Sequence, residues 1–506
     1  MVMRVTNQTQ QKNALDNIFR ITEDLFNAQK EITSGKRIHK PSDDPAGIRD
    51  TLMLRTNIKQ IKQFGRNING NQVFLQTGDA ALGSIGVSLI RAKEISMVEL
   101  GGLSTSETRG YAKAELQNII STVLQAANTK AKNMFIFSGT NVRTTPFEIS
   151  ASGAVYKGNT DSYTIQVAED TNVKINQPGS DVLGTDLNPD LNTSTLVSQL
   201  NGGTGISAGS FSITDRAGNS GNVTVSNNMT LEMVISAISN VSTNITASIN
   251  SSANGITITD TSSLIKQSLT VSEISGGTTA TDLGVLGKKD GNIEGTDLNA
   301  TLSTLTLISE LNDGQGLALK DINIMNGAAS GTVSLSSATT ISGVINLING
   351  AGLNVTASIN SAGNALQVIS NNSSTVAVAG NIGADTTAED LGLGGGKNVI
   401  NTVIKLKQAM EKDDTFGILA SLNNLDSGLV SILEARAILG ATARRMETTE
   451  TNHQQDIVNQ NEQIANIEGA DLVEAASEFA AMEAALQASL SSTARIIQPS
   501  LLDFLR

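Results

Sequence analysis

Proline is nearly absent from most of the chain, and this feature constrains the fold more than any other. A proline in a helix interior removes a hydrogen bond and clashes with the preceding turn. The six prolines are Pro41, Pro45, Pro146, Pro178, Pro189 and Pro499, so residues 46–145 and 190–498 contain none. Apolar residues recur at heptad spacing near both ends, and uninterrupted helices are allowed there. The sequence therefore predicts long helices in both flanks.

The N-terminal flank is predicted to form three helices. Gly35, which suits a left-handed cap, ends the first, and Asp44 before Pro45 provides an N-cap for the second, with Asp43 near its positive end. A capping box at Ser104 and Glu107 predicts a third helix that reaches about Asn133. The apolar stripes are Leu15, Ile18, Thr22, Leu25, Gln29 and Ile32 in the first helix, and Leu54, Ile61, Ile68, Leu75, Leu82 and Leu89 in the second.

The C-terminal flank mirrors this pattern. Gly469, Ala470 and Asp471 offer a helix end and a new N-cap. The stripe before this break is Ile432, Leu439, Met446, Ile457, Ile464 and Ile467, and the stripe after it is Leu472, Phe479, Met482, Leu486, Leu490 and Ile497. Polar residues interrupt the seams at Thr22, Gln29, His453 and Gln460. Such narrow stripes are unstable alone, so we expect the terminal helices to need neighbouring subunits.

The middle of the chain is duplicated and acidic. Gly184–Asn188 recurs as Gly295–Asn299, and Ile245–Ser251 recurs as Val355–Ser361, with shifts of 111 and 110 residues. Residues 181–396 contain 17 acidic and 5 basic residues, whereas the two flanks together are nearly balanced, with 31 and 30. Alternating strand patterns surround a short helix in each copy. We expect a solvent-facing α+β insert that assembly does not need.

These patterns predict mainly α flanks, which form a long antiparallel bundle or coiled coil from paired N- and C-terminal segments. The flanks enclose an α+β, β-rich region of two tandem repeats. The predicted domains are 1–44 with 465–506 as a terminal coiled coil, 45–180 with 397–464 as a helical bundle with a β hairpin, 181–294 as the first repeat, and 295–396 as the second repeat.

Composition argues against catalytic chemistry. Cysteine is absent, the two histidines are His39 and His453, and no nucleophile–base pair, metal constellation or cofactor loop emerges. The glycines of 392–396 suit a hinge better than a phosphate loop, and Asp43 and Asp44 suit helix capping better than a metal site. The net charge of −13 disfavours nucleic acid, and no apolar run approaches a membrane span. We therefore predict no enzyme, cofactor, metal, nucleic-acid binding or membrane insertion.

Several motifs resemble the flagellin-like family of bacterial flagellar axial proteins, and within it the hook-associated members. They include the opening Met3–Thr6 and the segment Thr33–Ile38 followed by Pro41, Ser42, Asp43, Asp44 and Pro45. The segment Phe135–Thr140, with Phe135, Phe137 and Gly139, resembles the family's exit from the third helix into a hairpin. The ending Ser500–Leu505, with Leu501, Leu502, Phe504 and Leu505, differs from the usual flagellin ending. The two central copies resemble hook-IN repeats.

The resemblance implies an extracellular structural subunit at the junction between flagellar hook and filament. Its implied partners are further copies of itself, a hook-associated protein on the hook side, flagellin on the filament side, and an export chaperone. Export without a cleaved signal peptide is also implied. The capping, Phe135–Gly139 and C-terminal residues named above are the predicted assembly residues. Two alternatives remain: flagellin itself, which differs in copy number, and an exported adhesin-like surface protein that binds through the insert.

Overall fold

The chain divides into two compact units. The first unit comprises residues 1–68, 167–170 and 446–506, and the second comprises residues 69–166 and 171–445. The computed structural model describes residues 7–150 and 153–497. Two long helices, α2 (Pro45–Glu99) and α10 (Thr415–Glu468), contribute residues to both units.

The predicted fold class is confirmed, because both flanks are helical and the centre is rich in strands. The other long helices are α1 (Asn7–Ser34), α3 (Ser106–Ala127), α9 (Val399–Glu411) and α11 (Leu472–Ile497). Short elements follow α3: β1 (Lys130–Ala131), β2 (Met134–Phe135), β3 (Phe147–Ser150), β4 (Gly153–Tyr156), β5 (Thr164–Ala168), β6 (Thr171–Lys174) and α4 (Gly179–Val182). The strands β3 and β4 form an antiparallel hairpin.

Local capping chemistry sets several helix boundaries as predicted. Gly35 has φ +67° directly after α1, a conformation that glycine adopts without steric penalty. Asp44 Oδ1 accepts a hydrogen bond from Gly47 N at 2.9 Å at the start of α2. Asp471 Oδ1 accepts one from Val473 N at 2.9 Å at the start of α11. These side chains satisfy amide groups that the first helical turn leaves without carbonyl partners.

The prediction for the third helix was wrong at both ends. Thr105 and Thr108 form the capping box of α3, and Ser104 Oγ donates to the carboxylate of the buried Glu99 instead. The helix ends at Ala127 rather than near Asn133, because β1 and β2 pair as a tight hairpin. Lys132 and Asn133 form its turn with positive φ angles.

Within the second unit, α2 and α10 approach closely at small residues. A Cβ added to Gly78 would lie 3.1 Å from Leu439 Cδ1, and one added to Gly86 would lie 3.6 Å from Ile432 Cγ2. Each of the two helices contains an 18-residue window apolar enough to cross a membrane, contrary to our expectation. Core helices pass the same test, and Leu82, which lies between Gly78 and Gly86 in α2, is fully buried.

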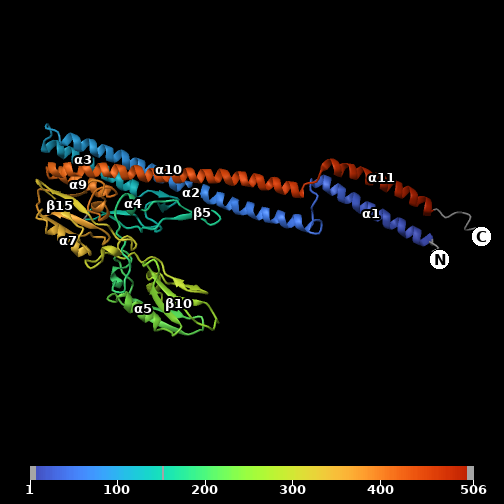
Figure 1. Cartoon of the computed structure of the whole chain (residues 1–506), viewed down its shortest axis with the longest axis horizontal. Helices are drawn as coiled ribbons and strands as arrows, with labels where there is room; N and C mark the ends of the chain where they lie inside the picture. The colour runs from blue at the N-terminus through green and yellow to red at the C-terminus, as the bar shows by residue number, and fades with distance from the viewer. Residues whose placement is uncertain (1–6, 151–152, 498–506) are drawn as a thin grey trace, which may run out of the picture. The chain divides into compact units, whose positions relative to one another are not determined.

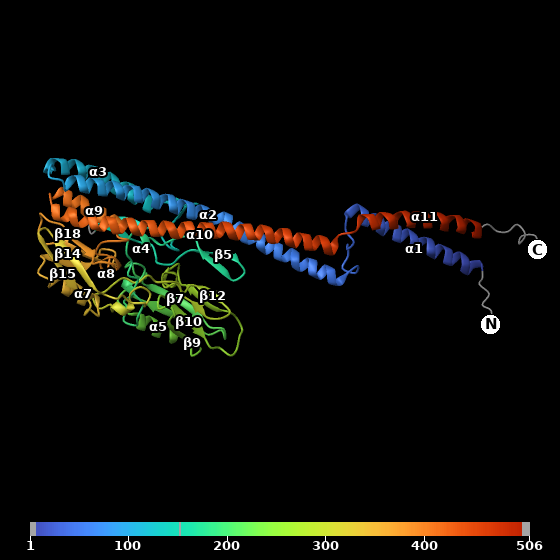
Figure 2. The ribbon, with the colours of Figure 1, turned by 45° about the horizontal axis from the view of Figure 1, so that its top comes forward.

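The first repeat is built around two antiparallel sheets, the helix α5 and the short helix α6. One sheet has the order β12-β11-β7-β8 and the other β13-β10-β9, and α5 packs on β8 and β9 (Figure 2). The elements are β7 (Gly209–Thr214), β8 (Ser220–Val225), α5 (Leu231–Ser239), β9 (Ile245–Ile249), β10 (Ile256–Asp260), β11 (Leu269–Glu273), α6 (Thr279–Asp282), β12 (Gly287–Lys289) and β13 (Ile293–Glu294). Phe211 and Ile213 are fully buried in their common core.

The second repeat has the same plan with fewer strands. Its sheets are β15-β14-β18 and β16-β17, and α7 packs on β15 and β16. The elements are β14 (Asp321–Asn326), β15 (Ala329–Ser334), α7 (Ile341–Asn349), β16 (Val355–Ile359), β17 (Leu366–Ser370), β18 (Ala377–Asn381) and α8 (Thr387–Asp390). In both copies a threonine caps the helix, Thr230 for α5 and Thr340 for α7. The sequence duplication thus corresponds to a structural one.

The segment that precedes each repeat in the sequence packs in the core of the other repeat. Leu187 belongs to the core of the second repeat, and Leu298 belongs to the core of the first. Accordingly Leu187 N donates to Asn364 O at 2.8 Å, and Leu298 N donates to Asn254 O at 2.8 Å. The first repeat is therefore inserted into the second. The core of the first repeat uses residues 191–300, and the core of the second uses Leu187 and residues from 302 onward. The boundaries between the cores thus lie near 190–191 and 301–302, whereas the predicted boundaries lay before 181 and 295.

Candidate assembly site

The two terminal helices of the first unit, α1 and α11, lie side by side along their lengths (Figure 1). Few of their described side chains are buried, notably Ala28 and Ala475. Ile21 and Ala28 lie on the inner face of α1, whereas the predicted seam residues Thr22 and Gln29 are exposed. A two-helix pair with alanine in its contact buries little apolar area, so its own packing stabilises it weakly.

Large apolar groups remain on the outside of this pair. Phe19 is 71% exposed and Phe26 is 64% exposed, and they lie seven residues apart on one face of α1. On α11, Val473 is 80% exposed and Leu490 about half exposed. Full burial of a phenylalanine contributes about 1.5–3 kcal/mol, so Phe19 and Phe26 each retain roughly two thirds of that for association. Such a surface fits packing against other helices.

A buried carboxylate connects the α1–α2 turn to the α10–α11 break. The Glu468 side chain is 6% exposed and accepts hydrogen bonds from Lys36 Nζ at 2.9 Å and Arg55 Nη2 at 2.7 Å. Backbone groups reinforce this contact, because Arg37 N donates to Glu468 O at 2.8 Å and Ala470 N donates to Gly35 O at 3.1 Å. The sequence reasoning missed Glu468, although an acidic residue directly before Gly469 was visible.

The predicted assembly residues Pro41, Asp43, Asp44 and Pro45 shape the same turn. Asp43 Oδ2 accepts from Lys40 N at 2.7 Å and from His39 N at 3.0 Å, and these backbone donors lower the pKa of the Asp43 carboxyl. The Gly47 amide likewise lowers the pKa of Asp44. Both aspartates therefore stay ionised and fix the chain entering α2. Their contacts are local, and their role in assembly stays a prediction.

The predicted residues Phe135, Phe137 and Gly139 belong to the interior of the second unit. Phe137 is fully buried, and its carbonyl oxygen accepts from Tyr156 Oη at 2.9 Å. Gly139 has φ +70°, and a Cβ there would lie 2.1 Å from Asn159 Oδ1. Lys130 Nζ lies 4.2 Å from the centroid of the Phe135 ring. These residues hold the hairpin region together, so any effect on assembly acts through the fold.

The C-terminal residues Leu501, Leu502, Phe504 and Leu505 lie outside the described residues, as does Met3–Thr6. Among the described residues, no group of three or more His, Cys, Asp or Glu side chains is arranged to hold a metal ion. The exposed apolar side chains of the first unit form a surface for packing.

Comparison with known proteins agrees with this geometry. Residues 5–142 match the bacterial flagellin N-terminal helical region, and residues 422–505 match the bacterial flagellin C-terminal helical region. Both helical flanks of the chain are therefore flagellin-like. Because the flagellin family consists of structural flagellar proteins, the prediction that the chain is not an enzyme is confirmed. The two matched regions contain all of α1 and α11.

Individual relatives match mainly through these flanks. The chain is 23% identical over 186 residues to flagellar hook-associated protein 3 of Salmonella typhimurium, which covers 36% of this chain and 57% of that protein. It is 30% identical over 113 residues to flagellin of Listeria monocytogenes, and this match covers 22% of this chain and 39% of the flagellin. The match thus spans about half the length of these relatives.

Solved structures of hook-associated proteins also align with the chain. The flagellar junction protein FlgL from Legionella pneumophila aligns at 17% identity with a TM-score of 0.35, covering 83% of this chain and 99% of that one. FlgL of Xanthomonas campestris aligns at 15% identity with a TM-score of 0.34, covering 81% and 99%.

Proposed function

We propose that the chain is the structural subunit that joins hook and filament in the bacterial flagellum. In this role it self-assembles into a ring or short helical array outside the cell. The observation that carries the proposal is the exposed apolar surface on α1 and α11, in segments that match the flagellin helical regions. Association with neighbouring copies buries Phe19 and Phe26 and stabilises the weak helix pair.

The junction role is favoured over that of flagellin by the extent of the match. Identity to the hook-associated protein extends over 186 residues, whereas identity to the Listeria flagellin extends over 113. In our proposal, a second hook-associated protein contacts one side of the array and flagellin contacts the other. An export chaperone covers the apolar termini before assembly, and the chain leaves the cell without cleavage of a signal peptide.

The four predicted domains complete this proposal. The terminal coiled coil of 1–44 and 465–506 forms the innermost layer, and the bundle of 45–180 and 397–464 forms the next. The two repeats within 181–396 carry nearly all of the net charge, and charge repeated around a ring is tolerated where water and salt screen it. We therefore assign the repeats to the outer surface of the array.

Immunogold labelling of isolated flagella tests the junction role. We expect a few gold particles at the boundary of hook and filament, with the filament itself unlabelled. A strain that lacks the protein should release flagellin into the medium and carry bare hooks. Label along the whole filament would assign the chain to the flagellins, and normal filaments in the deletion strain would favour the adhesin-like alternative.

A further inference from the structure

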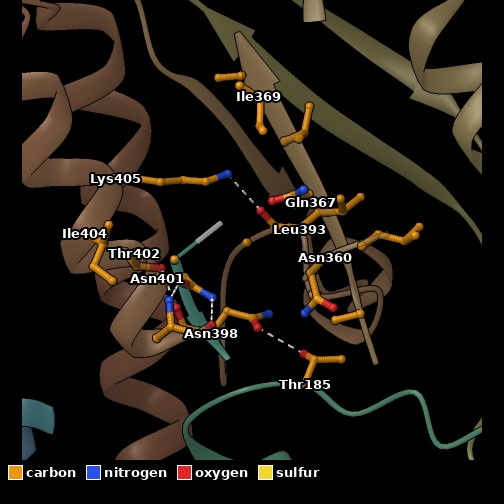
Figure 3. A pocket seen from close by; sticks show the side chains of 18 of the residues that line it. Thr185, Asn360, Gln367, Ile369, Leu393, Asn398, Asn401, Thr402, Ile404 and Lys405 are labelled. Carbon is orange, nitrogen blue, oxygen red and sulfur yellow. Dashed lines mark hydrogen bonds between the residues drawn. The ribbon is translucent and has the colours of Figure 1, made fainter. Parts of the chain in front are cut away.

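The second unit contains a cavity of about 170 Å³ in a place that the assembly function does not use. Helix α9, strand β17 and the hairpin β3–β4 line it, together with the turn at Gly392–Gly394 (Figure 3). Ile369 and Ile404 contribute apolar wall. The cavity therefore lies where the second repeat meets the helical flank.

The charge of this cavity is opposite to that of the chain. The net charge of the protein is −13, yet none of the described residues that line the cavity is acidic. Its two charged lining residues are Lys405 and Lys412. Lys412 is exposed and donates to Thr375 O at 2.8 Å, whereas Lys405 extends from α9 across the cavity. The site thus presents a cationic group to any small molecule that enters.

Lys405 is short of partners for a charged group. Its Nζ donates to Leu393 O at 3.2 Å, and it forms no ion pair with the described residues. An ammonium group has three donors, and removing one from water without an anionic partner is unfavourable. Burial accordingly lowers the pKa of Lys405 to about 8. At neutral pH the amine is still mostly protonated, so an entering anion would gain a charge-assisted hydrogen bond.

A second polar group beside the same cavity also has an atom without a hydrogen-bond partner. Gln367 reaches in from β17, and its buried Oε1 atom has no hydrogen-bond partner. Its amide nitrogen donates to Ser358 Oγ at 3.0 Å, and the oxygen has too little accessible surface for a ligand atom to reach it. Asn401 is satisfied, because it pairs with both backbone groups of Ala154. The cavity therefore offers one cation between apolar walls.

From these features we infer that the cavity binds a small carboxylate with a short branched apolar side chain. The carboxylate contacts Lys405, and the apolar side chain packs on Ile369 and Ile404. An engineered cavity of about 150 Å³ holds benzene, so a cavity of this size holds a ligand of about six to nine non-hydrogen atoms. This inference does not depend on the proposed assembly function.

Isothermal titration of the full-length chain with 4-methylpentanoate tests the proposal. The comparison ligand is 4-methylpentanamide, which has the same shape and lacks the charge. The test variant is Lys405→Met, which keeps most of the apolar length of the side chain, and the matched control is Lys407→Met on the same helix. Circular dichroism confirms that each variant folds, and loss of a buried unpaired charge gives no reason for Lys405→Met to unfold.

We expect saturable binding with one ligand per chain and at least a tenfold loss in Lys405→Met, with Lys407→Met unchanged. Binding should weaken as the pH rises from 7 to 10, because Lys405 loses its proton. The proposal is overturned if no binding occurs up to 10 mM, about the weakest useful affinity. It is also overturned if the neutral amide binds as tightly, or if folded Lys405→Met binds like the unchanged chain.

Discussion

Replacing Glu468 by glutamine should loosen the contact between the α1–α2 turn and the α10–α11 break. The substitution keeps the shape of the side chain but removes the charge that holds Lys36 at 2.9 Å and Arg55 at 2.7 Å. Hydrogen bonds to charged groups contribute about 1.5–3 kcal/mol. Both basic side chains are about half exposed, so solvent screening reduces their contribution. We therefore expect local opening to become easier by about 1–2 kcal/mol.

Hydrogen exchange measured by mass spectrometry reads this opening directly. The amides of Arg37 and Ala470 donate across the contact, to Glu468 O and Gly35 O. Their protection in the full-length monomer should fall about 5- to 30-fold in Glu468→Gln, which corresponds to the expected change in free energy. The matched control is Glu462→Gln, an exposed position on the same helix. Equal protection in Glu468→Gln and the unchanged chain, or equal losses in both variants, would refute the reasoning.

Three further predictions concern assembly and pH. Phe19→Ala with Phe26→Ala should leave the unfolding midpoint of the monomer nearly unchanged but reduce assembly into arrays, as measured by sedimentation, because both rings face solvent in the monomer. Deleting 496–506 should leave the repeats folded yet release flagellin into the medium, and normal filaments would contradict it. Burial, opposed by the Asn188 amide, raises the pKa of Asp186 to about 7, so the ionised carboxylate destabilises the fold. The folded state binds the proton more tightly, so the second unit should lose thermal stability as the pH rises from about 4 to 7, less so in Asp186→Asn.

The helix boundaries that could be predicted from the sequence depend on local chemistry. Gly35, Asp44 with Pro45, and Asp471 act through their own φ angle or through amides a few residues away, so the sequence contains the needed information. The predicted capping box at Ser104 was wrong because the next residue, Thr105, occupies the N-cap position of α3. Ser104 instead bonds Glu99, and only the fold brings that carboxylate close.

Glu468 and the nested repeats could not be predicted for a related reason. A carboxylate in the last turn of a helix is unfavourable by itself, and Lys36 and Arg55, which compensate for it, are more than 400 residues away in sequence. Likewise, the repeated segments around Leu187 and Leu298 are equivalent in sequence. Nothing local determines which copy of the repeat each segment packs against.

Because the first repeat is inserted into the second, the prediction that the insert can be removed without loss of assembly applies to the first repeat and not to the whole insert. The second repeat packs on the helical flank, because Val376 N donates to Asp414 Oδ2 at 2.8 Å and Asn424 Nδ2 donates to Ala379 O at 2.8 Å. Splicing residue 180 to 397 would leave Asp414 and Asn424 without these partners. Each buried polar group left unpaired costs about 1–3 kcal/mol.

Removing the first repeat alone should be tolerated, because its core closes within 191–300. The cut ends lie on the second repeat, where Asp190 N donates to Glu310 O at 2.7 Å and Leu302 N donates to Gly363 O at 2.6 Å. A short Gly/Ser linker from Asp190 to Leu302 should therefore preserve the melting temperature of the remaining chain, its export and filament growth. The variant spliced from 180 to 397 is the comparison and should lose stability. If removing 191–301 abolishes filaments while the larger deletion supports them, the nested arrangement is wrong and the first repeat contributes to assembly.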